Sequence, residues 1–181
     1  MTRAHKVAVI PGDGIGVEVT AEAVKSLRAV APALARPIEL VEFDWGAERW
    51  LRDGTTLPKG AVEDLRDHYA AILFGALGDP RVPEQVHARD ILLGLRFQLD
   101  LYINLRPVKL LDERLTPLKA KRVADIDMLV FRENTEGLYA GVGGNFKKGT
   151  ADEIAINEDI NTRKGVERIL RAAFAAARTR R

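Results

Sequence analysis

The sequence contains no cysteine among its 181 residues. This absence excludes a disulfide scaffold, a cysteine-ligated zinc site and a thiol nucleophile. Long apolar runs are also lacking: none approaches the roughly 20 residues that span a bilayer. The short apolar stretch near the N-terminus runs directly into a glycine turn, unlike a secretory signal. We therefore expect a globular protein of a reducing compartment, which favours a cytoplasmic location without a membrane partner.

A strong excess of either charge is absent too, because 28 Lys and Arg stand against 26 Asp and Glu. The three histidines are scattered and the carboxylates do not cluster, so the sequence predicts no metal ligands within these residues. Basic residues are distributed along predicted helices without interleaved aromatic residues. The charge pattern therefore predicts no nucleic-acid partner.

The first half of the chain alternates between strand-like apolar runs and helical spacing. Strands are predicted over residues 6–11, 38–43 and 70–74, and helices from Ile15 to Pro32 and from Pro58 to about His68. In the first helix the apolar positions are Val19, Ala23, Leu27 and Val30. This alternation predicts an α/β fold with a mostly parallel open sheet and flanking helices.

The second half has a different pattern. We expect a helix over residues 90–101, an extended stretch over 102–111, a strand over 127–132 and a final helix capped by Thr162. The apolar positions of that final helix are Val166, Ile169, Leu170, Ala173, Phe174 and Ala177. Residues 152–160 alternate with period two, which indicates an antiparallel arm. We therefore predict a first α/β domain over residues 1–104 and part of a second α/β domain over residues 105–181.

Two glycine-rich turns follow predicted strands. The first, GDGIG, spans residues 12–16, and the second, GALGDP, spans residues 75–80. In open parallel sheets the carboxyl ends of the strands line the ligand crevice, so both turns are expected at one sheet edge. The first turn has neither the dinucleotide-binding nor the P-loop spacing. A purely structural role, with Asp13 capping the helix, is the alternative.

Three arginines in apolar surroundings are the most informative side chains. Arg96, Arg106 and Arg132 each lie among leucine, isoleucine, valine or phenylalanine. A guanidinium keeps its charge, so three convergent ones would suit a substrate with two carboxylates. The alternative is that they are separate structural arginines, paired with acids such as Glu133 and Asp100.

Tyr139 lies in a glycine-flanked turn that follows Arg132. A phenol in this position could act as a general acid, although an isolated tyrosine can also serve packing alone.

Taken in order, five segments resemble the isocitrate and isopropylmalate dehydrogenase family of β-decarboxylating, NAD(P)-dependent enzymes. They are KVAVIPGDGIGVEV, GALGDP, ILLGLR with NLRP ten residues later, FRENTEGLY and TRKGVERILRAAF. Their order and spacing match across nearly the whole chain. The resemblance implies that Arg96, Arg106 and Arg132 bind malate carboxylates and that Tyr139 is catalytic.

The resemblance also implies an oxidative decarboxylation with NAD and Mg²⁺ or Mn²⁺ as cofactors, in which Tyr139 protonates the enol product. It implies that Ile15 lies near the adenine. It places a loop along the nicotinamide side, formed by Gly75, Ala76, Leu77, Gly78, Asp79 and Pro80. The family's catalytic lysine, metal-binding aspartates and adenosine loop match nothing in these residues. We therefore expect an N-terminal half that is inactive alone and belongs to a homodimer when full-length.

Substrate choice in this family depends on the helix before Arg96, where isocitrate users resemble Ser-x-Asn. Here that helix carries Asp90, Leu92 and Leu93, which would repel a γ-carboxylate and suit the apolar γ-substituent of 3-isopropylmalate. The segments Phe43-Asp44-Trp45 and Tyr102-Ile103-Asn104, however, look more like D-malate and tartrate dehydrogenases. Isocitrate is disfavoured, and the other acids stay open. A non-catalytic subunit that binds a dicarboxylate is the alternative of another class.

Overall fold

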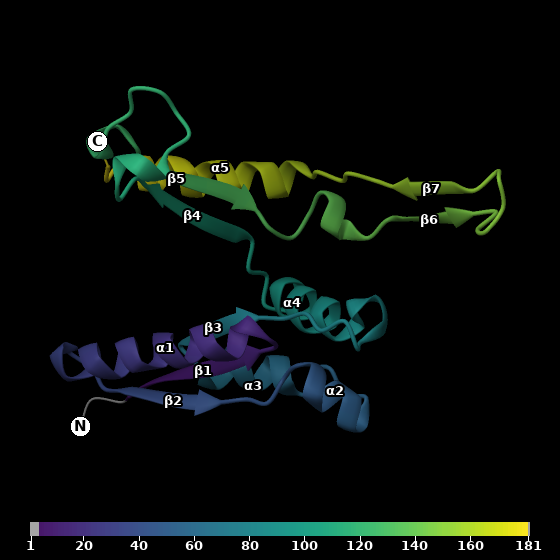
Figure 1. Ribbon diagram of the computed structural model, residues 1–181, viewed down its shortest axis with the longest axis horizontal. Coiled ribbons are helices and arrows are strands. Elements are labelled where there is room, and N and C mark those ends of the chain that lie inside the picture. The colour runs from purple at the N-terminus through teal and green to yellow at the C-terminus, as the bar shows by residue number, and fades with distance from the viewer. Residues whose placement is uncertain (1–3, 181) are drawn as a thin grey trace. The chain divides into compact units, whose positions relative to one another are not determined.

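The computed structural model describes residues 4–180, and the chain divides into two compact units, residues 1–99 and 100–181 (Figure 1). The first unit is a parallel α/β layer structure and the second is built from antiparallel strand pairs and one long helix. The predicted α/β class with an antiparallel arm is therefore confirmed. The domain boundary at residue 104 stays a prediction.

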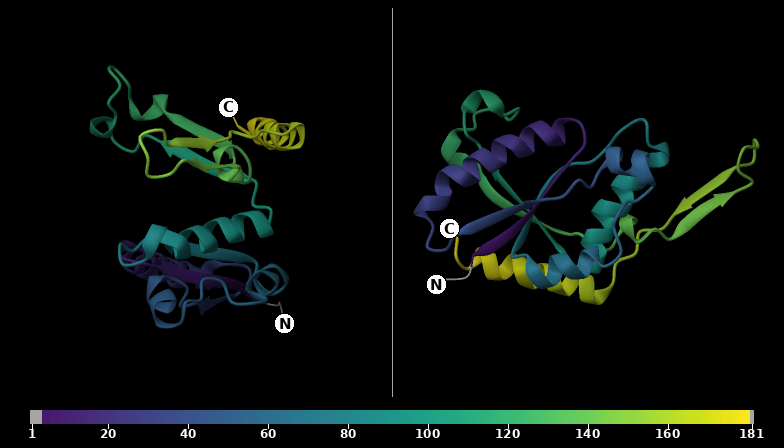
Figure 2. Two further views of the ribbon diagram at one scale, coloured as in Figure 1. Left: turned by 90° about the vertical axis from the view of Figure 1, so that its right-hand side faces the viewer. Right: turned by 90° about the horizontal axis from the view of Figure 1, so that it is seen from below.

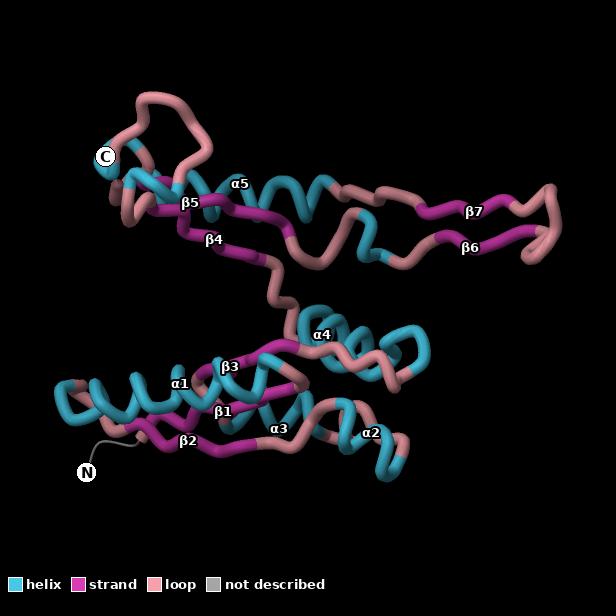
Figure 3. Tube along the Cα trace, viewed as in Figure 1, coloured by secondary structure: helices cyan, strands magenta, loops and turns pink. Residues whose placement is uncertain are grey.

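In the first unit, residues 4–99 form three strands and four α-helices. They are β1 (His5–Gly12), α1 (Ile15–Val30), β2 (Ile38–Glu42), α2 (Ala47–Asp53), α3 (Ala61–His68), β3 (Ala71–Ala76) and α4 (Val86–Gln98). The strand order is β2-β1-β3 (Figure 3). Every pairing in this sheet is parallel, as the alternating pattern predicts. Because β1 is central, the turns that follow β1 and β3 lie at the same edge of the sheet.

The core of the first unit lies on one face of this sheet, under α3 and α4. Ala8 and Ile10 of β1 point into it. The remaining buried members are Trp45, Val62, Leu65, Ile91 and Leu95. Phe43 and Tyr69 pack at its margin, with ring centroids 5.6 Å apart. Two helices that lie far apart in the sequence thus share one apolar layer with β1, which fixes α4 on the sheet.

The other face of the sheet is covered by α1, and the contact depends on small residues. Gly16 and Thr20 are the buried residues of α1. A Cβ on Gly75 of β3 would lie 2.6 Å from Thr20 Oγ1, so the close approach of helix and strand requires glycine there. The predicted apolar positions Val19 and Val30 are exposed instead, because the helix turns its small residues towards the sheet.

The second unit contains four strands and the helix α5 (Arg163–Ala177). Strand β4 (Ile103–Lys109) pairs with β5 (Asp127–Glu133), and β6 (Gly143–Phe146) pairs with β7 (Ile154–Asn157), both antiparallel. All the residues of β6 and β7 are exposed, and the hairpin extends away from the rest of this unit (Figures 1 and 2). The period-two alternation therefore belongs to an arm, as predicted.

Helix α5 begins as predicted at Thr162, whose hydroxyl oxygen accepts a hydrogen bond from Gly165 N at 3.0 Å. Its apolar positions divide into two sets. Ile169 and Ala173 are partly covered, while an apolar stripe formed by Val166, Leu170 and Phe174 is exposed, Phe174 to 71%. The spacing of four residues places the stripe along one side of the helix.

Helix boundaries were predicted less well than strands. The helix predicted from residue 90 begins at Val86, and the one predicted from Pro58 begins at Ala61. Helix α2 was not predicted. None of the helices formed by residues 4–180 combines the length and the apolar character that crossing a membrane requires.

Candidate functional site

Two of the three predicted arginines lie on the same face of the β4–β5 pair. Asn104 pairs directly with Arg132, and Arg106 pairs with Val130. Residues that oppose each other across an antiparallel pair share a face, as do residues two apart in one strand. Arg106 and Arg132 are therefore diagonal neighbours on one face, within mutual reach of long side chains.

The opposite face of the same strands packs against α5. On this face, Arg168 of α5 donates to Glu133, and Arg180, which follows α5, donates to Asp127. The arginine face is the one turned away from α5, and Met128 and Val130 on it are exposed. The pairing register therefore gives the β4–β5 pair two different faces. One packs against α5, and the other carries the guanidinium groups of Arg106 and Arg132.

A short chain of amides orients Arg106. Its Nε donates to Asn104 Oδ1 at 2.9 Å, and Asn104 Nδ2 donates to Asn134 Oδ1 at 3.1 Å. Asn134 is buried and its Nδ2 donates to the Leu101 carbonyl at 3.1 Å. Neither asparagine was predicted as a site residue. The available signal was an asparagine inside an apolar strand, a position that usually demands a hydrogen-bond partner.

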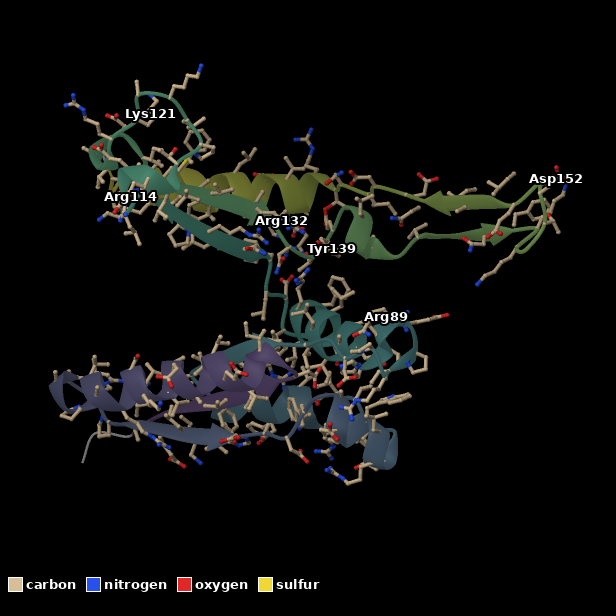
Figure 4. The ribbon with its side chains drawn as sticks, viewed as in Figure 1. Arg89, Arg114, Lys121, Arg132, Tyr139 and Asp152 are labelled. Atoms are coloured by element: carbon tan, nitrogen blue, oxygen red, sulfur yellow. The ribbon has the colours of Figure 1, made fainter. Side chains whose placement is uncertain are left out.

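Tyr139 lies beside Arg132, as Figure 4 shows. The guanidinium carbon of Arg132 is 5.0 Å from the centroid of the Tyr139 ring, a cation–π contact. Tyr139 belongs to a single helical turn, Leu138–Ala140, that follows the end of β5. The structure therefore brings Arg106, Arg132 and Tyr139 together within the second unit.

The acids suggested as structural partners for these arginines bind a different arginine. Arg168 of α5 donates to Asp100 at 2.9 Å and to Glu133 at 2.8 Å, and its guanidinium carbon lies 4.5 Å from the Tyr102 ring centroid. Burial raises the pKa of Glu133, but hydrogen bonds from Thr135 and Arg168 outweigh burial and hold that pKa below its usual range. Glu133 is therefore ionised at neutral pH and serves to fix α5 on β5.

The remaining predicted arginine, Arg96, belongs to the first unit, near the end of α4. Leu92 and Leu93 precede it by four and three residues, which places the leucines beside the arginine on the helix surface. Leu92 is exposed, Leu93 and Arg96 are half-buried, and Asp90 lies 3.6 Å from Arg89. Leu92, Leu93 and Arg96 thus lie outside the buried set of α4, which is His87, Ile91 and Leu95.

The two glycine-rich turns meet at the end of β1 and β3. Asp13 N donates to the Ala76 carbonyl at 2.7 Å, and a Cβ on Gly12, whose φ is +75°, would lie 2.1 Å from that oxygen. The predicted cofactor residue Ile15 starts α1 and is 67% exposed. The close backbone approach that glycine permits therefore sets both turns at one edge, as the sequence predicts.

Asp13 holds these turns together through its buried carboxylate. Its Oδ1 accepts from Ala47 N at 2.6 Å, and its Oδ2 accepts from Gly78 N at 2.9 Å and lies 2.8 Å from His87 Nε2. The prediction that Asp13 caps α1 is wrong, because the residue before that helix is Gly14 and no side chain caps it. Asp13 instead joins the start of α2, the second glycine turn and α4.

The outer part of the second glycine turn is fixed by polar side chains. Asp79 N donates to Gln85 Oε1 at 2.9 Å, and Gln85 Nε2 donates to the Asp79 carbonyl at 2.6 Å. Hydrogen bonds from the Arg81 guanidinium lower the pKa of Asp79 to about 2. The backbone of residues 75–80 is thus held at both ends, which suits a loop that lines a binding crevice.

The donor set for a divalent metal is not present among residues 4–180, where no group of three or more His, Asp or Glu side chains is arranged to hold an ion. The family's metal therefore has no fit among the described residues.

The sequence model of the isocitrate/isopropylmalate dehydrogenase family matches residues 6–181. A 3-isopropylmalate dehydrogenase of Thermobifida fusca is 53% identical over 98% of this chain and 50% of its own length. One from Streptomyces griseus is 51% identical over 100% of this chain and 52% of its own length.

Solved structures agree. The crystal structure of isocitrate dehydrogenase from Methylococcus capsulatus has a TM-score of 0.73 and 32% identity, covering 97% of this chain and 48% of that one. A β-decarboxylating dehydrogenase from Thermococcus kodakarensis has a TM-score of 0.66 and 33% identity, over 97% of this chain and 46% of that one. The chain spans about half the length of the curated relatives that it matches. It belongs to the isocitrate/isopropylmalate dehydrogenase family.

Proposed function

We propose that this chain supplies the carboxylate-binding arginines and the catalytic tyrosine of an NAD-dependent 3-isopropylmalate dehydrogenase. The observation that carries the proposal is the placement of Arg106, Arg132 and Tyr139 within one unit, with the guanidinium of Arg132 over the tyrosine ring. The names of the relatives from Thermobifida and Streptomyces support this acid over D-malate and tartrate.

The two arginines hold the substrate. Each guanidinium keeps its positive charge and can bind a carboxylate through two parallel N–H donors. Because Arg106 is oriented by Asn104, less conformational freedom is lost when the carboxylate binds. Arg96 is the third carboxylate ligand of the proposal, as the family resemblance implies.

The tyrosine moves a proton. NAD, which the loop Gly75–Pro80 would hold, would supply the acceptor for the hydride of C2 of the 2-hydroxy acid, with the hydroxyl proton passing to a base. After the β-carboxylate has left as CO₂, the phenolic O–H of Tyr139 donates its proton to the carbon that lost the carboxylate.

The cofactor's nicotinamide end is assigned to the loop Gly75–Pro80, and Ile15 to the adenine end. The fit is supported by the two glycine turns, which meet at the carboxyl edge of the parallel sheet, and by the exposure of Ile15. No step is assigned to Mg²⁺ or Mn²⁺, because the described residues do not offer a donor set.

Substrate selectivity is assigned to α4. Leu92 and Leu93 offer apolar surface for a γ-isopropyl group, and the carboxylate of Asp90 on the same helix disfavours a γ-carboxylate. Isocitrate would therefore bind more weakly than 3-isopropylmalate.

The proposed partner is a second copy of the protein. The exposed apolar stripe Val166, Leu170 and Phe174, together with the exposed hairpin β6–β7, supports such an association. The cytoplasmic location stays a prediction.

The test joins residues 1–181 to the second half of the Thermobifida fusca relative and measures NADH formation from 3-isopropylmalate, D-malate and isocitrate. We expect turnover of 3-isopropylmalate at least about tenfold above the other acids, because one mismatched group in a pocket is worth about 1–3 kcal/mol. The variant Arg132→Lys should raise KM, since lysine cannot reproduce the bidentate contact.

Two results would overturn the proposal. One is a folded fusion protein without turnover of any malate-type acid, and the other is preferential turnover of isocitrate or D-malate. Calorimetric titration of the 181-residue chain with 3-isopropylmalate then addresses the remaining alternative. Micromolar binding without turnover in the fusion protein would favour a non-catalytic dicarboxylate-binding subunit.

A further inference from the structure

The carboxylate of Glu136 lies against the first turn of α5. Its Oε2 accepts from Thr162 N at 2.8 Å and its Oε1 accepts from Thr162 Oγ1 at 2.6 Å. The same threonine is the N-cap of α5, so its hydroxyl donates to Glu136 and accepts from Gly165 N. Glu136 and Thr162 are 26 residues apart in the sequence, so this contact ties two distant segments together.

Gly165 makes the contact possible. A Cβ at this position would lie 2.2 Å from Glu136 Oε2 and 2.8 Å from Oε1. Real Cβ atoms essentially never approach another atom as closely as 2.2 Å. The carboxylate of Glu136 can therefore occupy this position only because residue 165 is glycine. Glu136 and Gly165 therefore form a matched pair, and either one can be changed to disturb the other.

The segment that follows Glu136 is pinned at the same place. Gly137 N donates to the Ile160 carbonyl at 2.8 Å, and Gly137 adopts a φ of +73°. Glu136 N donates to Glu133 Oε2 at 2.7 Å. Two residues of this segment thus have fixed positions immediately before the turn that carries Tyr139.

The turn that carries Tyr139 starts directly after Gly137. Ala140 N donates to the Gly137 carbonyl at 3.1 Å, which closes the turn, and Leu138 and Tyr139 are exposed. Because Glu136 and Gly137 are held immediately before this turn, their position sets where the turn begins and so where the tyrosine ring lies beside Arg132.

We propose that Glu136 is a positioning residue for Tyr139: its carboxylate fixes the Glu136–Gly137 corner against α5 and so keeps the phenol beside Arg132. This inference rests on the proposed function for its catalytic consequence but not for its structural one. The role requires a hydrogen-bonding side chain of the length of glutamate rather than its charge.

The structural test reads Tyr139 directly in the 181-residue chain. The protein has three tyrosines, so labelling them with ¹³C at the ring Cζ gives three resonances, and Tyr139→Phe identifies one of them. We expect Glu136→Ala and Gly165→Ala each to shift or broaden the Tyr139 resonance, while that of Tyr69, in the first unit, stays unchanged.

Two further variants separate positioning from charge and from nonspecific damage. Glu136→Gln should restore the wild-type Tyr139 resonance, because its amide oxygen can accept from Thr162 N while its NH₂ group donates to the threonine hydroxyl. Glu158→Ala, which removes an exposed glutamate just after β7, should leave the spectrum unchanged. If Glu136→Ala does not fold, Glu136→Asp takes its place, since it keeps the charge but shortens the side chain.

In the fusion protein used to test the proposed function, Glu136→Ala and Gly165→Ala should lower kcat about tenfold or more with KM within about twofold, because a misplaced acid loses rate rather than binding. A role confined to the stability of α5 would lower the unfolding temperature without this split.

An unchanged Tyr139 resonance in folded Glu136 and Gly165 variants would overturn the positioning role. So would a Glu136→Gln variant that behaves as Glu136→Ala does. If the wild-type fusion protein turns over no acid at all, the proposed function fails, and the resonance of Tyr139 still decides whether Glu136 positions it.

Discussion

At the scale of single residues, the buried carboxylate of Asp13 joins three segments of the first unit: the start of α2, the second glycine turn and α4. It accepts from two backbone N–H groups and lies 2.8 Å from the fully buried imidazole of His87. A buried donor that loses its acceptor costs about 1–3 kcal/mol. Asp13 therefore determines how the two glycine turns and α4 are held.

We expect Asp13→Ala to lower the free energy of unfolding by about 3 kcal/mol or more, because it removes the acceptor of the Ala47 and Gly78 N–H groups and the partner of the buried His87 imidazole. Urea unfolding followed by tryptophan fluorescence measures this, since Trp45 is buried in the adjoining core. The control Asp152→Ala, on the exposed hairpin, should change stability by less than about 0.5 kcal/mol. Equal losses for the two variants would contradict the role of Asp13.

Asp79 gives the second glycine turn a dependence on pH. Its pKa lies at about 2, below the ordinary 3.8, so folding favours the ionised carboxylate. Its stabilising contribution is therefore complete above about pH 4, and it is lost as the pH falls towards 2. We expect the urea midpoints of the wild type and Asp79→Asn to differ at pH 5 and to converge at pH 2. A gap that stays constant over this range would refute the assignment.

At the scale of elements, strands follow from the sequence better than helices do. The runs that became β1 and β3 are apolar and end in glycine-rich turns, and β2 follows Pro37 with alternating apolar and charged residues, so their positions and parallel pairing could be predicted. Helix α4 could not be placed correctly, because Glu84 and Gln85 precede it with positive φ and no capping side chain marks its start. Helix α2 could not be predicted, because it has only seven residues and begins after Gly46. The N–H of its first residue, Ala47, donates to the carboxylate of Asp13, which is distant in the sequence.

The approach of β1 to β3 depends on a glycine that is required for two reasons. Gly12 has a φ of +75°, and a Cβ would lie 2.1 Å from the Ala76 carbonyl oxygen. Gly54, at the end of α2, has a φ of +73° and nothing within 4 Å of its Cβ position. Comparing substitutions of Gly12 and Gly54 therefore separates the energetic cost of the left-handed backbone conformation from the cost of the close approach between the strands.

We expect Gly54→Ala to lower the free energy of unfolding by about 1 kcal/mol, the cost of the left-handed conformation alone. Gly12→Ala should cost at least about 2 kcal/mol more, since the strand ends must move apart to admit the methyl group. Thermal or urea unfolding of both variants measures the difference. Similar losses in the two proteins would mean that the β1–β3 turn relaxes without strain.

At the scale of the whole molecule, the sequence predicts which residues form the site, but not which residues hold them in position. The arginine face could not be inferred, because the extended stretch 102–111 and the strand 127–132 are predicted separately, and only their pairing register places Arg106 and Arg132 on one face. Asn134, Glu136 and Arg168 could not be inferred. Each acts through a contact with a residue at least 26 positions away, and only folding brings those positions together.

The exposed apolar stripe on α5 is the whole-molecule feature that a second copy would cover. Val166, Leu170 and Phe174 are spaced by four residues and are 46%, 51% and 71% exposed. Burying such side chains is the main favourable term in protein association. Charge at the centre of the stripe should therefore oppose dimerisation.

We expect the 181-residue chain to form dimers in light scattering and sedimentation, and Leu170→Glu to raise the dissociation constant at least about tenfold, since losing one central apolar contact costs more than about 1.4 kcal/mol. Val19→Glu is the matched control, because Val19 is 49% exposed on a helix of the other unit. It introduces the same charge and should leave the dissociation constant unchanged. If both variants dimerise as the wild type does, or if the wild type stays monomeric at millimolar concentration, the stripe does not join two copies.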